Sequence, residues 1–448
     1  MYLSSGPMTS IPLPYRLAVG AVRIAAPVLA RSSSKLGRGM EGRRDAHGAL
    51  VRWAATERDV RRPLVWFHAP SVGEGLQAQA VMRALRATRP EMQVVFTYFS
   101  PSAEPLGARF GADVAGYLPW DTRTLMTPVL DALRPDLIVF TKTEVWPVLV
   151  EEARARGVPV AIVAASVPPR AGRLSRPARA LLRGTWATLS AGLACAPDDA
   201  RGLAELGVPR EIIQVMGDPG IDAAVERAEA ARPDAPYLAP FRQAAGAGRP
   251  SPTVVLGSTW PSDEAVFLPA LEAVRARVPD VRVVLAPHEP GGDRVGGLLG
   301  TFMERGWHPG TLAHMEIDGV IGDVNAVVVE RVGVLSDLYT IATVACVGGG
   351  FHDAGLHSVL EPAAAGVPVL FGPRHHNARS AGELVELGGA EVAVDAAAAA
   401  EALIRWLTDR AARAYAAKRA RDYIQDHRGA AARTARRLDL LMKTPDSR

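Results

Sequence analysis

The sequence predicts an α/β protein built from two doubly wound parallel-sheet domains. The chain has 448 residues, and a single hydrophobic core rarely serves more than about 250–300 residues, so two domains are expected. Apolar runs rich in β-branched residues alternate with helical patterns, as in parallel sheets that are covered on both faces. This alternation stops once and then restarts, which indicates that the second domain repeats the architecture of the first.

Five apolar runs are the strand candidates of the first domain, residues 34–222. Turn residues bound each run, and helical patterns near 73–89 and 144–156 follow two of them. The predicted strands are PLVWFHA at 63–69, QVVFTY at 93–98, DLIVFT at 136–141, VPVAIVA at 158–164 and AGLACA at 191–196.

The second domain, residues 253–408, repeats this theme after a stretch rich in Ala, Pro, Arg and Gly. That stretch, 223–252, contains no strand candidate and is predicted to be a linker with one short helix. A helix is expected over about 262–277, and the chain is Ala/Arg-rich and helical from 396 onward. The predicted strands are TVVLG at 253–257, VRVVLA at 281–286, AVVV at 326–329, VACV at 344–347 and VPVLF at 367–371.

The N-terminal segment, residues 1–33, is basic and amphipathic. Residues 1–62 carry eleven Lys and Arg against four Asp and Glu, although the whole chain has a net charge of only +4. This imbalance favours an anionic surface, and the absence of a nucleic-acid motif favours lipid over nucleic acid. No apolar run reaches the ~18–20 residues of a spanning helix. A helix over 11–30, with Arg16 and Arg23, would lie in the membrane interface or pack on the protein body.

The composition and the two cysteines give no sign of a metal or disulfide framework. Apolar residues make up 48% and charged residues 22% of the chain, as in ordinary globular proteins. Cys195 and Cys346 lie in apolar stretches and are expected to be buried thiols. We therefore expect no metal site and a reducing, cytoplasmic location.

Two acidic motifs follow strand candidates of the first domain. After 63–69, Ser71 is placed as an N-cap, Gly73 permits a close turn, and Glu74 falls in the first helical turn. Glu74 would face a cleft, or it would only complement the helix dipole. After 136–141, Lys142 and Glu144 would line a site for an acidic substrate, or Glu144 would merely lie near a helix N-terminus.

Two further motifs suggest anion binding in the second domain. Residues 257–260, GSTW, would place N–H groups and two hydroxyls at a helix N-terminus. Residues 348–362, GGGFHDAGLHSVLEP, contain three glycines that would let a phosphate approach the backbone, with Glu361 on the following helix facing back into the loop. Polar residues gather again at 372–377, GPRHHN. Their histidines form no fixed ligand set, so anion or hydroxyl recognition is favoured over metal.

Two Rossmann-like domains joined by one linker form the GT-B arrangement, in which ligands bind in a central cleft at the carboxyl ends of the strands. Within it, the motifs in this order resemble the 3-deoxy-D-manno-octulosonic acid (Kdo) transferase family over residues 34–407. The most specific pieces are HAPSVGE at 68–74, RPDL and EVWP within 134–147, GSTWP at 257–261, and VGGGF followed by HSVLEPAAAGVPVLFGP within 347–373.

The resemblance implies an inverting glycosyltransferase that uses CMP-Kdo as donor, a lipid A precursor (lipid IVA) as acceptor and no essential metal. Glu74 matches the family's proposed general base, and Glu144 matches a second glutamate that places acceptor or donor. The location implied is peripheral, on the cytoplasmic face of the inner membrane, in lipopolysaccharide biosynthesis. Family analogy also predicts that a C-terminal helix within 409–448 crosses back to the first domain.

These matches and the loop chemistry predict two sets of binding residues. The acceptor or other anions are expected at Ser71, Gly73, Lys142 and Arg170. The donor and its nucleotide are expected at Gly257, Ser258, Thr259, His288, Gly349, Gly350, His357, Ser358, Glu361 and Asn377.

The chain departs from the family pattern in three places. Ser358 stands where the common motif has Asn, and residues 217–220, GDPG, lack the usual basic residue. Residues 167–170, VPPR, replace a stretch rich in Arg and Ser, and Arg170 and Arg173 are candidates to substitute for it. Two alternatives stay open: another GT-B enzyme such as a nucleotide-sugar epimerase, and a catalytically decayed lipid- or nucleotide-binding relative.

Overall fold

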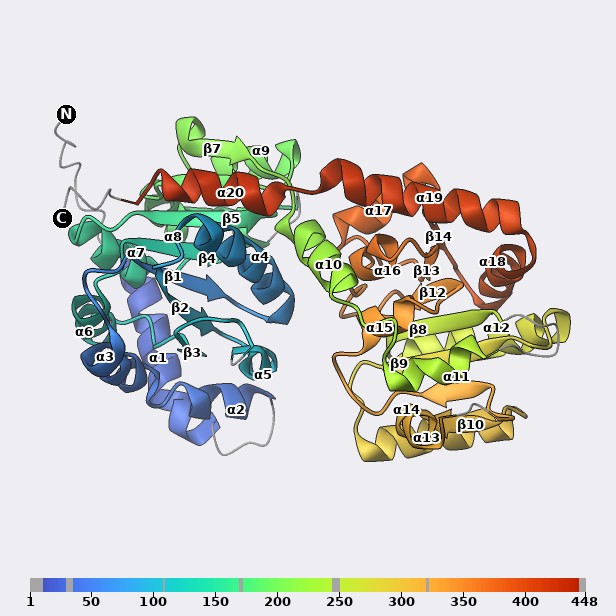
Figure 1. The fold of residues 1–448 in the computed structure, drawn as a ribbon. Coiled ribbons are helices and arrows are strands. Elements are labelled where there is room, and N and C mark those ends of the chain that lie inside the picture. The colour runs from blue at the N-terminus through green and yellow to red at the C-terminus, as the bar shows by residue number, and fades with distance from the viewer. Residues whose placement is uncertain are drawn as a thin grey trace. The chain divides into compact units, whose positions relative to one another are not determined.

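The chain forms two compact units, each built around a seven-stranded sheet (Figure 1). The computed structural model describes residues 11–29, 35–107, 109–168, 172–243, 250–319 and 322–442. The first unit comprises the described residues within 1–223 and 428–448, and the second comprises those within 224–427. Every strand pairing recorded in the two sheets is parallel, so the predicted fold class of two parallel α/β domains is confirmed.

The helices and strands of the first unit alternate along the chain, and α10 continues from it into the second. They are α1 (Leu13–Leu29), α2 (Lys35–Gly42), α3 (Ala46–Glu57), β1 (Leu64–Ala69), α4 (Val72–Thr88), β2 (Gln93–Tyr98), η1 (Pro101–Ala103), α5 (Glu104–Gly107), β3 (Val114–Tyr117), α6 (Arg123–Leu133), β4 (Leu137–Thr141), α7 (Pro147–Ala155), β5 (Val160–Ala165), η2 (Gly172–Leu174), α8 (Arg176–Trp186), β6 (Ala191–Ala194), α9 (Pro197–Leu206), η3 (Arg210–Ile212), β7 (Ile213–Val215), α10 (Pro219–Glu229) and α20 (Ala430–Asp439).

The second unit repeats this alternation. Its remaining elements are η4 (Pro236–Leu238), α11 (Ala239–Arg242), β8 (Thr253–Thr259), α12 (Pro261–Arg277), β9 (Arg282–Pro287), α13 (Gly292–Glu304), β10 (Pro309–Thr311), α14 (Leu312–Asp318), β11 (Ala326–Val328), α15 (Leu335–Tyr339), β12 (Val344–Val347), α16 (Leu360–Ala364), β13 (Val369–Phe371), α17 (Arg379–Leu387), β14 (Ala390–Val392), α18 (Ala396–Thr408) and α19 (Arg410–His427).

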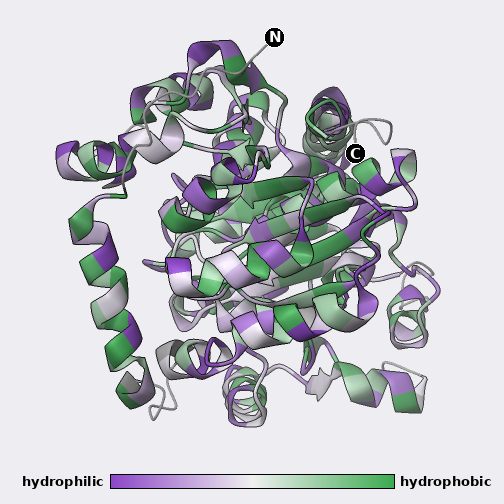
Figure 2. Cartoon of the chain, turned by 90° about the vertical axis from the view of Figure 1, so that its left-hand side faces the viewer, coloured by the Kyte–Doolittle hydropathy of each residue, from purple (hydrophilic) through white to green (hydrophobic). Residues whose placement is uncertain are grey.

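Successive side chains of the central strands feed two separate cores, one on each face of the sheet. In β1, Val65 and Phe67 join a core with α4 and α20, whereas Leu64 and Trp66 join the core under α3, α6 and α7. The second sheet is covered in the same way, with α12, α13 and α18 on one face and η4, α14 and α15 on the other. In the hydropathy view the strands are mostly green, whereas the helices alternate green and purple (Figure 2). Burial on both faces explains why the strand sequences are continuously apolar.

The sequence predicts every inner strand but misses all four edge strands. The sheet orders are β3-β2-β1-β4-β5-β6-β7 and β10-β11-β9-β8-β12-β13-β14. The missed strands are therefore the outermost ones: β3, β7, β10 and β14. Each has only three or four residues and is partly exposed. A short, half-exposed strand lacks the apolar run by which an inner strand is recognised.

Residues of the predicted linker, 223–252, contribute to the core of the second unit. Tyr237, Leu238 and Phe241 are buried together with strand residues such as Val255 and Val284. Because these side chains pack against the sheet, the described residues from 224 onward belong to that unit rather than to a separate linker.

The C-terminal segment, predicted over 409–448, contains two helices that belong to different units. Helix α19 lies in the second unit, whereas α20 lies in the first, where Ala431, Ala435 and Leu438 are buried with residues of α4. Gly429, with φ +90°, separates the two helices, and Asp222 accepts hydrogen bonds from the backbone N–H groups of Gly429 and Ala431.

A buried carboxylate, Asp121, joins helix α1 to the start of α7. Its Oδ2 accepts from the Tyr15 hydroxyl (2.7 Å) and from the Val148 N–H (2.9 Å), and its Oδ1 accepts from the Leu149 N–H (2.9 Å). Burial raises the pKa of Asp121 to about 6, although these three donors oppose the shift. Because α7 has no side-chain cap from its own N-cap residue, Trp146, Asp121 supplies that cap from a distant loop.

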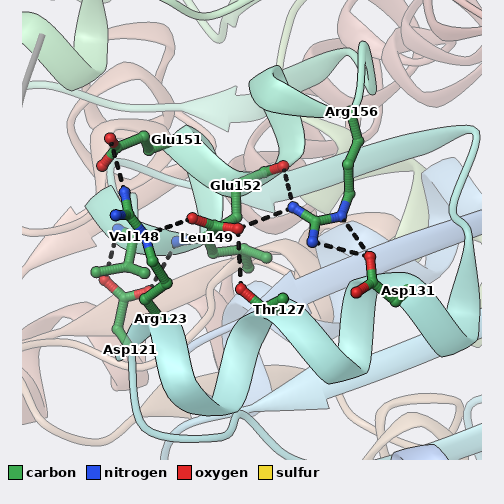
Figure 3. A network of polar contacts seen from close by, with 9 residues as sticks. All are labelled: Asp121, Arg123, Thr127, Asp131, Val148, Leu149, Glu151, Glu152 and Arg156. Carbon is green, nitrogen blue, oxygen red and sulfur yellow. Dashed lines mark hydrogen bonds and ion pairs between the residues drawn. The ribbon is translucent and has the colours of Figure 1, made fainter. Parts of the chain in front are cut away.

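A surface network continues from this cap along α6 and α7 (Figure 3). Glu152 accepts from Arg123 Nε (2.7 Å), Thr127 Oγ1 (3.0 Å) and Arg156 Nη1 (2.8 Å). Arg156 also donates to Asp131, whose side chain is largely exposed. The network fixes α7 against α6 and thereby fixes the segment that precedes α7.

We expect Asp121→Ala to destabilise the first turn of α7 by about 2–4 kcal/mol, because buried donors lose their acceptor. Hydrogen–deuterium exchange of residues 147–155 should accelerate accordingly. The matched control, Asp131→Ala, removes an exposed ion pair and should change protection by less than about 1 kcal/mol. Equal effects of the two substitutions would contradict the capping role of Asp121.

Candidate active site

Each sheet has a central point at which its strand order reverses, and most of the predicted site residues follow the strands that flank it. In the first unit the reversal lies between β1 and β4, and in the second between β8 and β12. Connections from neighbouring strands leave toward opposite faces there, so a crevice forms at the carboxyl ends. Glu74 follows β1 and Glu144 follows β4 in the first unit. Residues 257–260 and 348–357 occupy the corresponding places in the second unit.

Glu74 lies in the first turn of α4 and is half-buried. Ser71 is the N-cap residue, but it makes no side-chain cap bond; its hydroxyl donates instead to Glu74 Oε2. Gly73 is an exposed helical residue with open space around it, so it is not needed for a tight turn as the sequence suggested. Within the described part of the chain, the Ser71 hydroxyl is the hydrogen-bond partner recorded for the Glu74 carboxylate.

Glu144 lies before helix α7, which begins at Pro147 rather than near residue 144 as predicted. Its Oε1 contacts His68 Nε2 at 3.2 Å and accepts from Trp146 Nε1 at 3.0 Å. Burial raises the pKa of Glu144, but the hydrogen bond from His68, the charges of His68 and Arg173, and the hydrogen bond from Trp146 outweigh it, so the net pKa lies below its usual range. Glu144 is therefore a held anion, not an ordinary helix-start carboxylate.

Basic groups stand beside Glu144. Lys142 is half-buried and has a φ of +67°, a left-handed conformation that costs a non-glycine residue about 1–3 kcal/mol and is often found at functional sites. Arg173 Nη1 donates to Thr143 Oγ1 (2.8 Å). Arg170 lies outside the described residues, so its predicted role stays a prediction.

In the second unit, Gly257, Ser258 and Thr259 form the end of β8, and α12 begins only at Pro261. The N–H groups expected to bind an anion there are already used: those of Asp263 and Glu264 donate to the Trp260 carbonyl. The Trp260 N–H donates to Asp263 Oδ2 (2.8 Å), and the Thr259 hydroxyl donates to Glu264 (2.8 Å). The helix thus caps itself, which weakens the predicted anion site at its N-terminus.

The three glycines at 348–350 serve backbone packing. A Cβ on Gly348 would lie 2.2 Å from the Ser258 carbonyl oxygen, one on Gly349 2.2 Å from that of Gly355, and one on Gly350 2.3 Å from the Gly372 nitrogen. Asp263, fully buried, ties these loops together by accepting from the N–H groups of Gly349 (2.7 Å) and Phe351 (3.1 Å). The glycines are required for this close contact, a reason that the phosphate argument overlooked.

Trp260 organises three histidines at this edge of the second sheet. Its ring stacks on His352 (centroids 4.2 Å apart, 7°) and on His288 (4.5 Å, 26°), and His288 stacks on His357 (4.6 Å, 27°). Trp260 Nε1 donates to His357 Nε2 at 3.0 Å, so that nitrogen carries no proton. Burial, with His288 and His352 nearby, lowers the pKa of His357 to about 4.

Two other predicted donor residues have mainly local contacts. Asn377 clamps Leu356, accepting from its N–H (3.0 Å) and donating to its carbonyl (2.9 Å). Ser358 is exposed, and its hydroxyl accepts from the Leu360 N–H at 3.3 Å. Asn377 therefore braces the loop at 348–357, whereas Ser358 bonds only to the start of the helix that follows it.

Glu361 lies on α16, as predicted, but its carboxylate is paired elsewhere than in the glycine-rich loop. It accepts from Arg227 Nε (3.0 Å) and from the Ser336 hydroxyl (3.3 Å). It lines a cavity of about 450 Å³ within the second unit, together with Ser336, Thr340 and Glu229. Sequence reasoning missed Arg227, because its partner lies far away along the chain.

Within the part of the chain that the structure describes, no group of three His, Cys, Asp or Glu side chains is arranged to hold a metal ion. Cys346 is buried as expected, whereas Cys195 is only partly buried. Sequence reasoning also missed His68, Trp146, Trp260, His352 and Asp263 as parts of the two sites. Their clearest signal is position, since each lies at or just after the end of a strand that flanks a reversal point.

Two units, each built on a doubly wound parallel sheet, define the GT-B type of fold. The solved structure of UDP-GlcNAc 2-epimerase from Neisseria meningitidis bound to UDP-GlcNAc has the same fold, with a TM-score of 0.57 and 15% sequence identity over 84% of this chain and 99% of that one. At this identity the likeness concerns the fold alone.

Sequence comparison assigns the family. A family model described as 3-deoxy-D-manno-octulosonic-acid transferase (kdotransferase) matches residues 46–223. The 3-deoxy-D-manno-octulosonic acid transferase of Bordetella pertussis is 30% identical over 390 residues, which cover 84% of this chain and 86% of that protein. The Haemophilus influenzae transferase of the same name is 28% identical over 70% of this chain and 71% of its own length. The chain belongs to the 3-deoxy-D-manno-octulosonic acid transferase family of glycosyltransferases.

The depressed pKa of His357 predicts a loss of stability in acid. Between the unfolded pKa, about 6.5, and the folded value of about 4, the unfolded chain binds more protons, so stability falls as pH falls. His357→Gln keeps an acceptor for Trp260 but does not titrate. Between pH 7 and pH 4, this variant should lose about 3 kcal/mol less of its free energy of unfolding than the parent protein, as measured by urea unfolding. The exposed control His314→Gln should leave the pH dependence unchanged.

Proposed function

We propose that the protein transfers Kdo from CMP-Kdo to a lipid A precursor, with inversion at the anomeric carbon and without an essential metal. Family membership supports the reaction class. The observation that carries the proposal is the Glu74 carboxylate, which stands at the carboxyl end of β1 with a hydroxyl as its recorded partner. Such a carboxylate is suited to accept a proton.

In the proposed reaction Glu74 is the general base. The acceptor hydroxyl oxygen forms a bond to the anomeric carbon of Kdo as the bond from that carbon to the phosphate oxygen of CMP breaks. The hydroxyl proton passes to Glu74, and CMP leaves with the bonding electrons. A positioned base typically contributes a ~10²–10⁴-fold rate effect. Glu144, held as an anion by His68 and Trp146, is proposed to orient the acceptor.

The proposed donor carries a phosphate and a sugar carboxylate, so its site must supply hydrogen-bond donors and positive charge. His352 stacks on Trp260 beside the glycine-rich loop, and its Nδ1 accepts from the Ala354 N–H (3.0 Å), so its Nε2 carries a proton. Arg374 extends from the adjacent loop, where its backbone N–H donates to the Gly350 carbonyl (2.9 Å). These contacts support donor binding by the second unit.

Helix α1 is proposed to lie on the cytoplasmic face of the inner membrane. Its Leu13, Leu17, Ile24 and Val28 side chains are 61–81% exposed, and their spacing places them on one stripe. Tyr15, which bonds to Asp121, lies on the opposite side of the helix. Among the described residues no helix is long and apolar enough to span a bilayer. An exposed apolar stripe on a docked helix fits an interfacial position.

The first test of the reaction is transfer from CMP-Kdo to a tetraacylated lipid A precursor in the presence of EDTA. We expect product from the parent protein and a kcat lower by ~10²–10⁴-fold for Glu74→Gln, because the base is lost. The control Glu91→Gln changes an exposed carboxylate before β2 and should keep full activity. Nucleotide binding without transfer by the parent would point to another sugar or acceptor, and no binding at all to a decayed relative.

Membrane binding is tested by flotation with vesicles that contain anionic phospholipid. The double substitution Leu17→Glu and Ile24→Glu should lower the bound fraction at least tenfold, since two apolar side chains no longer enter the interface. Val394→Glu, at an exposed apolar position of the second unit, is the control. Undiminished binding after deletion of residues 1–30 would refute the interfacial helix.

A further inference from the structure

A chain of buried hydrogen bonds lies behind Glu144. Trp66 Nε1 donates to Thr97 Oγ1 (2.9 Å), Thr97 Oγ1 contacts His68 Nδ1 (3.0 Å), and His68 Nε2 contacts Glu144 Oε1 (3.2 Å). Trp66, Thr97 and His68 are completely buried. Burying three polar side chains in an otherwise apolar sheet core costs free energy unless each is hydrogen-bonded. The order of the hydrogen bonds along this chain therefore shows how each side chain is satisfied.

The two ends of this chain fix the direction of its hydrogen bonds. An indole N–H can only donate, so Thr97 accepts from Trp66. Trp146 Nε1 lies 3.2 Å from His68 Nε2 and 3.0 Å from Glu144 Oε1. Because a carboxylate can only accept, the contact between Nε2 and Oε1 requires a proton on Nε2, and the Trp146 N–H then belongs to Glu144. The Thr97 hydroxyl proton has two acceptors within reach, His68 Nδ1 at 3.0 Å and the Phe67 carbonyl at 3.4 Å. If the Thr97 hydroxyl donates to Phe67, Nδ1 donates to Thr97, so these contacts fix the proton on Nε2 and allow either role at Nδ1.

A stack of aromatic rings holds Glu144 from its other side. Trp146 Nε1 donates to the same oxygen, Oε1, at 3.0 Å. The Trp146 ring stacks on Phe99 with centroids 5.6 Å apart, and the guanidinium carbon of Arg43 lies 3.7 Å from the centroid of the Phe99 ring. Both recorded bonds thus fall on Oε1, and Oε2 accepts none from the residues that the structure describes.

We infer that His68 is a positioning residue: backed by Thr97 and Trp66, it fixes Glu144 as an oriented anion whose Oε2 binds a hydroxyl group of the sugar acceptor. This inference rests on the proposed function. Neither oxygen of the Glu144 carboxylate then has to take a proton during the reaction. Glu74 accepts the proton, and Glu144 aligns the sugar ring that bears the hydroxyl group.

The charge state of Glu144 gives this role a signature in the pH dependence of the rate. Burial raises the pKa of Glu144, and the hydrogen bond from His68 lowers it most, followed by the charges of His68 and Arg173 and the hydrogen bond from Trp146. Arg43 and Tyr15 are the other charged or titratable groups that interact with it. Removing the His68 donor must therefore shift protonation of Glu144, and the acid limb of the rate profile, to higher pH.

Two matched pairs of variants test the inference in the full-length protein. His68→Gln keeps an N–H near the position of Nε2, whereas His68→Asn does not reach Glu144. We expect His68→Asn to lower kcat roughly 10- to 100-fold with little change in the KM for CMP-Kdo, and to move the acid limb upward. His68→Gln should recover most of the activity. Likewise Thr97→Ser should retain activity that Thr97→Val loses.

The imidazole protonation state supplies a readout that does not depend on catalysis. In protein labelled with ¹⁵N-histidine, the resonances lost in His68→Gln identify His68, whose Nε2 should carry a proton. An Nε2 without a proton, or equal impairment of His68→Gln and His68→Asn, would overturn the inference. A parent protein that lacks transfer activity would instead refute the proposed function. The protonation of His68 would still test whether His68 donates to Glu144.

Discussion

Burial of both faces of a parallel sheet is the constraint on which this molecule depends. Each central strand sends alternate side chains into two apolar cores, so charged groups have almost no place along the strands. Polar chemistry is therefore confined to strand ends, and it gathers where neighbouring strands send their connections to opposite faces. His68, the next-to-last residue of β1, is completely buried, and its ring nitrogens contact Thr97, Glu144 and Trp146.

The two units solve the problem of positioning in different ways. The first holds its carboxylates with side chains: Ser71 contacts Glu74, and His68 and Trp146 contact Glu144. The second relies on its backbone, where glycines bring two loops into direct contact and the buried Asp263 accepts from the N–H groups of Gly349 and Phe351 in one of them and from that of Trp260. Side-chain contacts can hold a charged group in a defined position for chemistry. Closely packed backbone segments give a rigid surface suited to a polyanionic ligand.

The sequence predicts what short-range patterns encode. The inner strands, the helices after them and the positions of Glu74, Glu144 and Glu361 all follow from apolar runs and from the edge at which strands end. The edge strands escaped prediction because they are short and half-exposed. The contacts of the site residues could not be predicted for another reason. Arg227 bonds to Glu361, and Asn377 bonds to Leu356, only when segments that are separated in the sequence fold together. Glycines 348–350 were found, but their physical role in packing was visible only in three dimensions.

Asp121 has a consequence for how a surface helix can influence the interior. One carboxylate serves both Tyr15 on α1 and the first N–H groups of α7, and α7 follows directly on the Glu144–Trp146 segment. Detachment of α1 would admit water to Asp121 and weaken its hold on α7. By thermodynamic reciprocity, disorder at the start of α7 would loosen α1 by the same free energy. The seating of α1 and the order of the segment that bears Glu144 are thus one linked equilibrium.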